Sequence, residues 1–105
     1  MANTQFTVID AVVVEEGVQF TLAELCRACA AEPSTIIALV EEGLLQPNGS
    51  GPANWQFDGR ALPRARTAVR LAGDLRLSVD ATVLVLELLD EIQTLRARLR
   101  RAGLA

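Results

Sequence analysis

Apolar residues recur at steps of three and four along most of this chain, which is the spacing of amphipathic helices. The first helix is expected to run from Thr21 to about Ala28 or Cys29. Thr21 and Glu24 are placed to form a capping box, in which the threonine hydroxyl accepts a hydrogen bond from the Glu24 amide and the glutamate side chain accepts one from the Thr21 amide. This reciprocal cap fixes where the helix begins.

A second helix follows after a short turn. Pro33 suits its first position, where an amide hydrogen would have no partner, and Gly43 suits the left-handed turn that ends it. Two short helices joined by a turn predict a helix-turn-helix, with the second helix in the recognition position. Residues 44–47 and 55–57 are expected to pair as the two strands of a small hairpin wing around a glycine-rich loop.

The third helix is expected to follow Asp58, whose side chain is a good N-cap. It carries apolar residues at helical spacing, namely Leu62, Ala65, Val69, Ala72 and Leu75. Pro63 lies five residues past that cap and would delete an intrahelical hydrogen bond, so we expect an irregular start or a kink there.

The last helix begins at Ser78 or Asp80 and carries an a/d heptad seam, typical of a coiled coil. The seam consists of Ala81, Val85, Leu88, Ile92, Leu95 and Leu99, and the last five of these are the predicted dimer interface. A second apolar row, Leu84, Leu86 and Leu89, accompanies only the first half of the helix. That half is expected to dock on its own domain and also to meet another chain, which predicts a homodimer. The alternative is a helix that folds back on its own core.

The extension formed by residues 1–19 is rich in β-branched residues, which predict a strand over residues 6–14 and a short second strand near residues 18–20. The rest divides into the helix-turn-helix and wing, residues 20–59, and the third and last helices, residues 60–105. At 105 residues the chain is long enough for one core, so we expect one compact domain. The predicted fold class is mainly α, a winged helix-turn-helix followed by two further helices.

Charge is divided unevenly along the chain. Residues 1–59 carry eight acidic side chains and one basic one, Arg27, while residues 60–105 carry nine arginines and five acids. Affinity for duplex DNA comes mainly from lysine and arginine side chains that neutralise phosphates. A helix-turn-helix in a segment of net charge −7 is therefore expected to face a partner other than DNA.

The composition excludes most catalytic mechanisms. The chain has no lysine, histidine or tyrosine, which removes the commonest general base, metal ligand and Schiff-base amine. Cys26 and Cys29 form a CxxC, but no second pair or histidine completes a zinc site, so both are expected to be small core residues. We predict no enzyme activity, metal or cofactor. No apolar run is long enough to span a bilayer and the N-terminus lacks a basic signal region, so we expect a cytoplasmic protein.

The order of these elements resembles the winged helix-turn-helix of MerR-type regulators and, more specifically, the CbpM chaperone modulators. The resemblance covers residues 20–100. It rests on Phe20-Thr21 with Glu24, Leu25 and Cys26, on Val40-Glu41-Glu42-Gly43-Leu44, on Pro47 and Trp55-Gln56-Phe57-Asp58, on Arg66 with Ala68-Val69-Arg70-Leu71, on Leu75 through Leu77, and on Leu86, Leu88-Leu89-Asp90-Glu91-Ile92 and Leu95. Two features depart from that pattern: residues 5–19 are longer and more apolar than the family's usual leader, and Ala30 stands where a glycine commonly makes the turn.

The resemblance implies a protein that is not an enzyme. CbpM proteins bind the J-domain of a DnaJ-like co-chaperone, usually CbpA, and inhibit its stimulation of the Hsp70 ATPase. J-domains present a basic helix to Hsp70 (DnaK), so an acidic module fits that surface and competition is the expected mechanism. The acidic residues expected to meet the J-domain are Glu32, Glu41, Glu42 and Asp58, with Asp90 and Glu91 as an alternative patch.

The rival interpretation is a MerR-like transcriptional regulator. The recognition helix of such a regulator typically offers an arginine and aromatic residues. In this chain the corresponding residues, just before Val40-Glu41, are Ile36, Ile37, Ala38 and Leu39. Candidate phosphate contacts remain on the third helix, at Arg60, Arg64, Arg66 and Arg70. The sequence favours a protein partner over nucleic acid.

Overall fold

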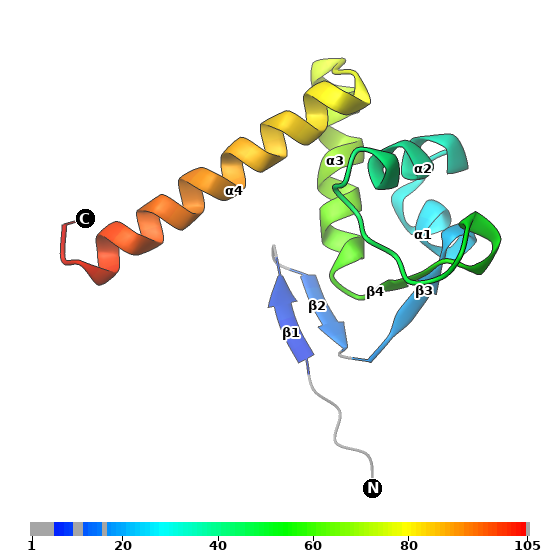
Figure 1. Cartoon of the computed structure of the whole chain (residues 1–105), viewed down its shortest axis with the longest axis horizontal. Coiled ribbons are helices and arrows are strands. Elements are labelled where there is room, and N and C mark those ends of the chain that lie inside the picture. The colour runs from blue at the N-terminus through cyan, green and yellow to red at the C-terminus, as the bar shows by residue number, and fades with distance from the viewer. Residues whose placement is uncertain (1–5, 10–11, 16, 105) are drawn as a thin grey trace, which may run out of the picture.

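The computed structural model describes residues 6–9, 12–15 and 17–104, and the side chains of residues 17–104. Four helices make up most of the fold: α1 (Leu22–Cys29), α2 (Pro33–Glu41), α3 (Ala61–Leu75) and α4 (Val79–Arg101). Figure 1 shows α1, α2 and α3 packed together, with the first turns of α4 beside α2 and α3, while the second half of α4 projects away from them. The mainly helical class and the order of the four helices are as the sequence predicts.

The predicted capping box is present at the start of α1. The Glu24 amide donates to Thr21 Oγ1 over 3.1 Å, and the Thr21 amide donates to Glu24 Oε1 over 2.8 Å. These bonds to Thr21 hold the pKa of Glu24 below its ordinary value, because the charged carboxylate is the better acceptor. At the other end of α1, Ala30 adopts a left-handed conformation with φ 52°, which a glycine would reach without steric cost.

Replacing Thr21 with alanine should lower the free energy of unfolding by about 1 kcal/mol, which is typical for the loss of a helix N-cap. Urea unfolding followed by far-UV circular dichroism measures this change. Thr21→Ser keeps the hydroxyl and is the matched control, so it should unfold close to the wild type. Equal losses in the two variants would show that the hydroxyl does not cap α1.

Glu24 adds a pH dependence to the same cap. Its pKa is lower in the folded protein than its ordinary value of 4.5, so its stabilising contribution is complete above pH 4.5 and is lost as the pH falls through the folded-state pKa. Glu24→Gln should therefore flatten the acid side of the stability curve and leave the neutral side closer to the wild type.

The predicted first strand of the wing is wrong. Residues 44–47 form no strand, because the amides of Leu44 and Leu45 both donate to the carbonyl of Leu39, over 2.9 and 3.4 Å, and so bind the end of α2. Both leucines are also buried, whereas consecutive residues of a strand point to opposite faces. The wing is instead a loop closed by one bridge, in which Asn48 and Gln56 exchange backbone hydrogen bonds of 3.0 and 2.9 Å.

The returning strand of the wing pairs with the segment that precedes α1. β4 (Gln56–Asp58) lies antiparallel to β3 (Gln19–Thr21), with Phe57 opposite Phe20. Trp55 meets Phe57 edge to face, with ring centroids 5.9 Å apart. This small sheet ties the entry of α1 to the entry of α3.

The N-terminal segment contains two strands in place of the single strand predicted over residues 6–14. β1 (Phe6–Ile9) pairs antiparallel with β2 (Val12–Glu15), in a register that sets Val8 opposite Val13. A run of β-branched residues favours extended structure but does not show where the chain reverses. Residues 10 and 11, between the two strands, lie outside the described residues.

The start of α3 corrects a second prediction. Asp58 does not cap this helix; its Oδ1 accepts a hydrogen bond from the Arg60 amide over 2.9 Å, in a turn that precedes α3. The helix begins at Ala61, three residues after Asp58. Pro63 therefore lies in the first turn, where helix amides have no intrahelical partner, and its ring removes no hydrogen bond.

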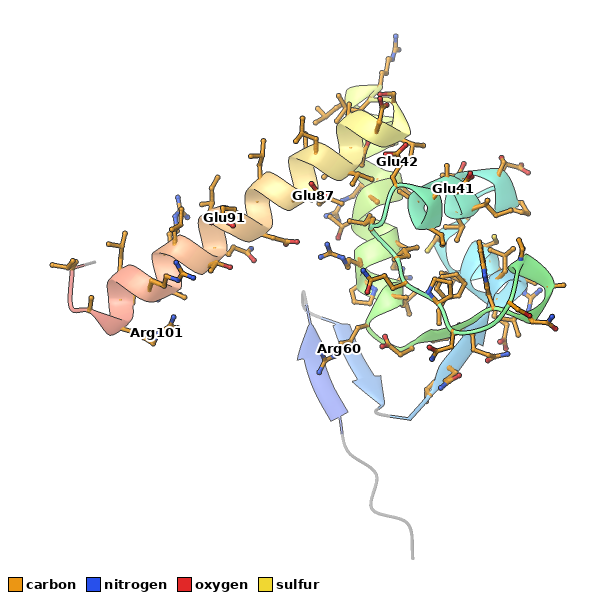
Figure 2. The ribbon with its side chains drawn as sticks, in the orientation of Figure 1. Glu41, Glu42, Arg60, Glu87, Glu91 and Arg101 are labelled. Carbon is orange, nitrogen blue, oxygen red and sulfur yellow. The ribbon has the colours of Figure 1, made fainter. Side chains whose placement is uncertain are left out.

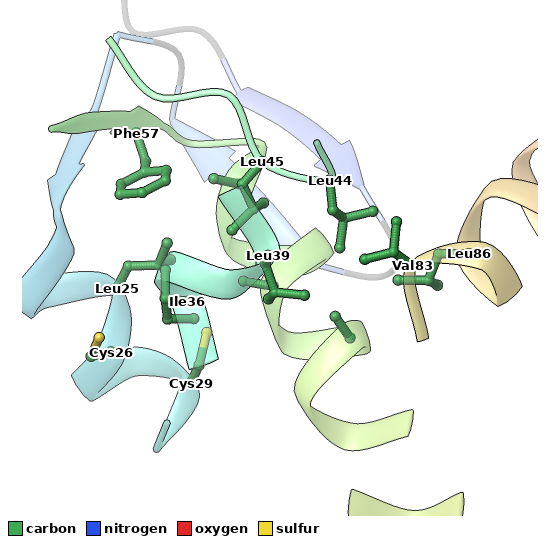
Figure 3. Close-up of a cluster of buried hydrophobic side chains, with 13 residues drawn as sticks. Leu25, Cys26, Cys29, Ile36, Leu39, Leu44, Leu45, Phe57, Val83 and Leu86 are labelled. Atoms are coloured by element: carbon green, nitrogen blue, oxygen red, sulfur yellow. The ribbon is translucent and has the colours of Figure 1, made fainter. Parts of the chain in front are cut away.

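One core joins the helix-turn-helix to β4, α3 and the start of α4 (Figure 3). Its largest fully buried side chains include Phe57, Leu25 and Ile36. Cys26 and Cys29 are free thiols in this core, as predicted, and burial raises the pKa of both. Within the described residues, no helix is long and apolar enough to cross a membrane.

Candidate protein-interaction surfaces

α4 has apolar side chains on two opposite sides. On the domain side, Thr82, Val83 and Leu86 are buried, and Figure 3 shows Val83 and Leu86 beside Leu44. Val83 and Ile92 are nine residues apart, which at about 100° per residue places Ile92 on the far side of the helix. The predicted seam lies on that far side. Leu88, Ile92, Leu95 and Leu99 are between 43% and 55% exposed, and Val85 is half-buried.

The second apolar row of α4 is split between these two sides. Only Leu86 docks on the domain, at 7% exposure, while Leu84 and Leu89 are 56% and 44% exposed. They widen the apolar strip around the seam rather than pack on the core. The cap at Ser78 is confirmed: its Oγ accepts from the Ala81 amide over 3.3 Å, and its carbonyl accepts from the buried Thr82 hydroxyl over 2.8 Å.

The acidic candidates on α2 lie at its two ends. Glu32 is exposed at the N-cap position, whereas Glu41 and Glu42 are exposed at the C-terminal end, about 13 Å further along a nine-residue helix. α2 packs against α4, and Figure 2 shows Glu42 close to the first turns of α4. The structure thus separates Glu32 from the other two acids of α2.

Asp58 lines a groove of about 330 Å³ between the end of α2 and the start of α3. Gly43, the residue after Glu42, lines the same groove, so Asp58 and the acidic end of α2 lie around one feature of the surface. The groove also contains Arg60 and Arg64, which gives it mixed charge. The groove lies where residues 44–47 follow the end of α2 instead of pairing with β4. The sequence pattern predicts a strand at residues 44–47, so it gives no sign of this groove.

The alternative acidic patch on α4 is partly occupied by an arginine. Arg64 Nη2 donates to Asp90 Oδ2 over 3.0 Å, and Arg64 Nε donates to the Leu44 carbonyl over 3.3 Å. Glu91 is exposed, and so is Glu87, which the sequence prediction left out. Figure 2 shows both glutamates on the middle turns of α4. Their spacing of four residues, which places them on one side of a helix, is the signal that would have found Glu87.

The recognition helix itself offers little to DNA. Ile36 and Leu39 are buried in the core at 0% and 2% exposure, and Ile37 and Ala38 are half-buried. The exposed side chains of α2 are Pro33, Ser34 and Glu41. None is a cation that neutralises a phosphate, and only the serine hydroxyl has a proton to donate to a base edge. Among the described residues, no cluster of three or more histidine, cysteine or acidic side chains is arranged to hold a metal ion.

These elements define a helix-turn-helix protein of the MerR type, and comparison with known proteins agrees. Residues 20–102 match the sequence model of the family described as MerR HTH family regulatory protein. The chain is 34% identical over 93 residues to Chaperone modulatory protein CbpM of Coxiella burnetii (strain Dugway 5J108-111), covering 89% of this chain and 88% of that protein. It is 38% identical over 80 residues to the protein of the same name from Pseudomonas entomophila (strain L48), covering 76% and 79%. The chain belongs to the CbpM family of chaperone modulatory proteins, which confirms the resemblance seen in its residues.

Proposed function

We propose that this protein is a non-enzymatic chaperone modulator that binds the J-domain of a DnaJ-like co-chaperone and inhibits the stimulation of Hsp70 by that co-chaperone. The observation that carries the proposal is a recognition helix without cations. α2 contains no basic residue and ends in the exposed acids Glu41 and Glu42. The names of its relatives in the CbpM family support a role in modulating chaperones.

Electrostatic attraction supplies a simple mechanism for this inhibition. Glu41, Glu42 and Asp58 are exposed carboxylates to which a basic helix would be drawn, and Glu87 and Glu91 are a further exposed acidic pair on α4. Complementary charge raises the association rate and selects against acidic partners. A J-domain held in this way would no longer present its basic helix to Hsp70, so the two proteins would compete for it.

We also infer that the protein acts as a homodimer through α4. The residues that carry this inference are Leu88, Ile92, Leu95 and Leu99, all 43–55% exposed on the side of α4 that faces away from the domain. Their a/d spacing is that of a coiled-coil seam, and a second copy presents the complementary seam. Pairing would remove from water an apolar strip that one copy of the chain leaves exposed.

An ATPase assay tests the proposed activity. We expect added protein to lower the co-chaperone-stimulated rate of Hsp70 toward the unstimulated rate, because J-domain held by this protein is withdrawn from Hsp70. Hsp70 alone, measured in the same series, should hydrolyse ATP at an unchanged rate. Raising the Hsp70 concentration should restore stimulation if the two proteins compete for one surface.

Two results would contradict the proposed function. One is the absence of heat and of complex formation when wild-type protein is titrated with the isolated J-domain. The other is a discrete, sequence-selective shift of duplex DNA at about 100 mM salt, where the screening length is about 10 Å. The second result would favour a transcriptional regulator, the alternative suggested by the MerR fold.

A further inference from the structure

Arg64 lies where three segments of the fold meet. It belongs to α3, its Nε donates to the carbonyl of Leu44 just after α2, and its Nη2 donates to Asp90 on α4. The contact with Leu44 spans 20 residues of sequence and the contact with Asp90 spans 26. One side chain therefore joins the helix-turn-helix to the C-terminal helix.

α4 has a short base and a long unsupported arm. Its buried residues, Thr82, Val83 and Leu86, all lie near its N-terminal end. From Glu87 to Arg101 every side chain is exposed except the half-buried Ala97. These 15 residues extend about 22 Å at 1.5 Å per residue, so a tilt of about 10° at the base moves the end by about 4 Å.

Asp90 lies one turn beyond Leu86, on the same side of α4, because residues four apart in a helix are neighbours. Its ion pair with Arg64 therefore extends the docked side of α4 by one turn. We propose that Arg64 is a positioning residue, which sets the direction in which the arm of α4 leaves the domain. The proposal goes beyond the chaperone function, since it holds whichever partner the protein binds.

An exposed ion pair often contributes little to a structure, and this pair is 40% and 50% exposed. The pair of Arg64 with Asp90 differs from a simple surface ion pair, because the planar guanidinium donates two hydrogen bonds. One goes to a backbone carbonyl and the other to the carboxylate. The carbonyl contact fixes the guanidinium, so the carboxylate is held at a defined place. A lysine has a single ammonium group and does not reproduce this two-point geometry.

Residual dipolar couplings of the backbone amides, measured on the ¹⁵N-labelled full chain, test the proposal. In the wild type the couplings of α3 and of residues 87–101 should fit one alignment tensor. In Arg64→Gln and in Asp90→Asn, the couplings of residues 87–101 should fall by a third or more relative to those of α3, or should require a differently oriented tensor. Arg64→Lys should give an intermediate result. Arg70→Gln, at an exposed position on the same helix, is the matched control and should behave as wild type.

Unchanged couplings in both Arg64→Gln and Asp90→Asn would overturn the proposal, and so would a wild-type arm that already needs its own tensor. The couplings within α3 report in the same spectra whether the domain remains folded. If Arg64→Gln unfolds, Asp90→Asn carries the test, because Asp90 is exposed and lies outside the core. In 1 M salt, where screening acts over about 3 Å, the wild-type arm should move toward the behaviour of the variants.

Discussion

Replacing Ile92 with aspartate is expected to convert the homodimer into monomers while the domain stays folded. Ile92 lies at the centre of the a/d seam, and its side chain is 44% exposed in the single chain, so the substitution leaves the core intact. In the dimer it would bury an unpaired carboxylate from each copy, which costs several kcal/mol. A loss of about 3 kcal/mol weakens association about a hundredfold. Light scattering at tens of micromolar protein should therefore report a dimer for the wild type and a monomer for Ile92→Asp.

Gln93→Asp is the matched control for this experiment. It introduces the same carboxylate on the next residue of α4, which is exposed and lies off the seam. The control should remain dimeric, and both variants should keep the wild-type far-UV circular dichroism spectrum. A wild-type chain that is already monomeric at these concentrations would refute the dimer without affecting the fold. Dissociation of both variants would point to the added charge rather than to the seam.

The helices could be predicted because their signals are local. The bonds that start α1 join residues three apart, and the bond that starts α4 joins Ser78 to Ala81. The turn that ends α2 also has a local signal. Gly43 adopts a positive φ of 85°, which a residue without a side chain reaches at little cost. Each of these features depends on neighbouring residues, so the sequence shows them directly.

The wing could not be predicted in the same way, because its pairing is decided by tertiary competition. The amides of Leu44 and Leu45 bind the end of α2 in preference to β4, and β4 finds its partner in β3, more than thirty residues earlier. The start of α3 follows the same logic: Asp58 has the side chain of an N-cap, yet it bonds in a turn before the helix. The intrinsic propensity of a residue shows which local structures it favours, and competing tertiary contacts decide which of these structures forms.

The sequence names the acidic candidates by residue type but does not show how they are arranged, and their role in binding stays a prediction. Acid-rich composition pointed to Glu41, Glu42 and Asp58; of these, Asp58 lines the groove, and Gly43, the residue after Glu42, lines it too. The same reasoning also chose Asp90 as an acidic candidate. No local pattern shows that Arg64, 26 residues earlier, donates a hydrogen bond to it. The role of Asp90 in partner binding remains a prediction, and its contact with Arg64 makes it a weaker candidate than the exposed Glu91.

Reversing the charge at the end of α2 is expected to weaken J-domain binding strongly. Glu41→Lys combined with Glu42→Lys changes the local charge by +4, and both residues are exposed, so the fold should survive. The substituted lysines would repel a basic helix where the wild type attracts it, and we expect the affinity to fall at least tenfold, or about 1.4 kcal/mol. Calorimetric titration of the isolated J-domain measures this difference.

The salt dependence and the control variant separate attraction at this surface from a general charge effect. Attraction between exposed charges weakens with ionic strength, so the wild-type complex should form more slowly as salt rises, and the double variant should lose that dependence. Two single variants make this comparison. Asp74→Lys changes the charge by +2 at an exposed position of α3 outside the candidate set, and Glu42→Lys makes the same change at the end of α2. Only Glu42→Lys should reduce binding. Equal effects of these two single variants would mean that net charge, not this surface, controls association. Unchanged affinity in the double variant, with the wild type binding, would exclude the end of α2 and direct attention to Glu87 and Glu91 on α4.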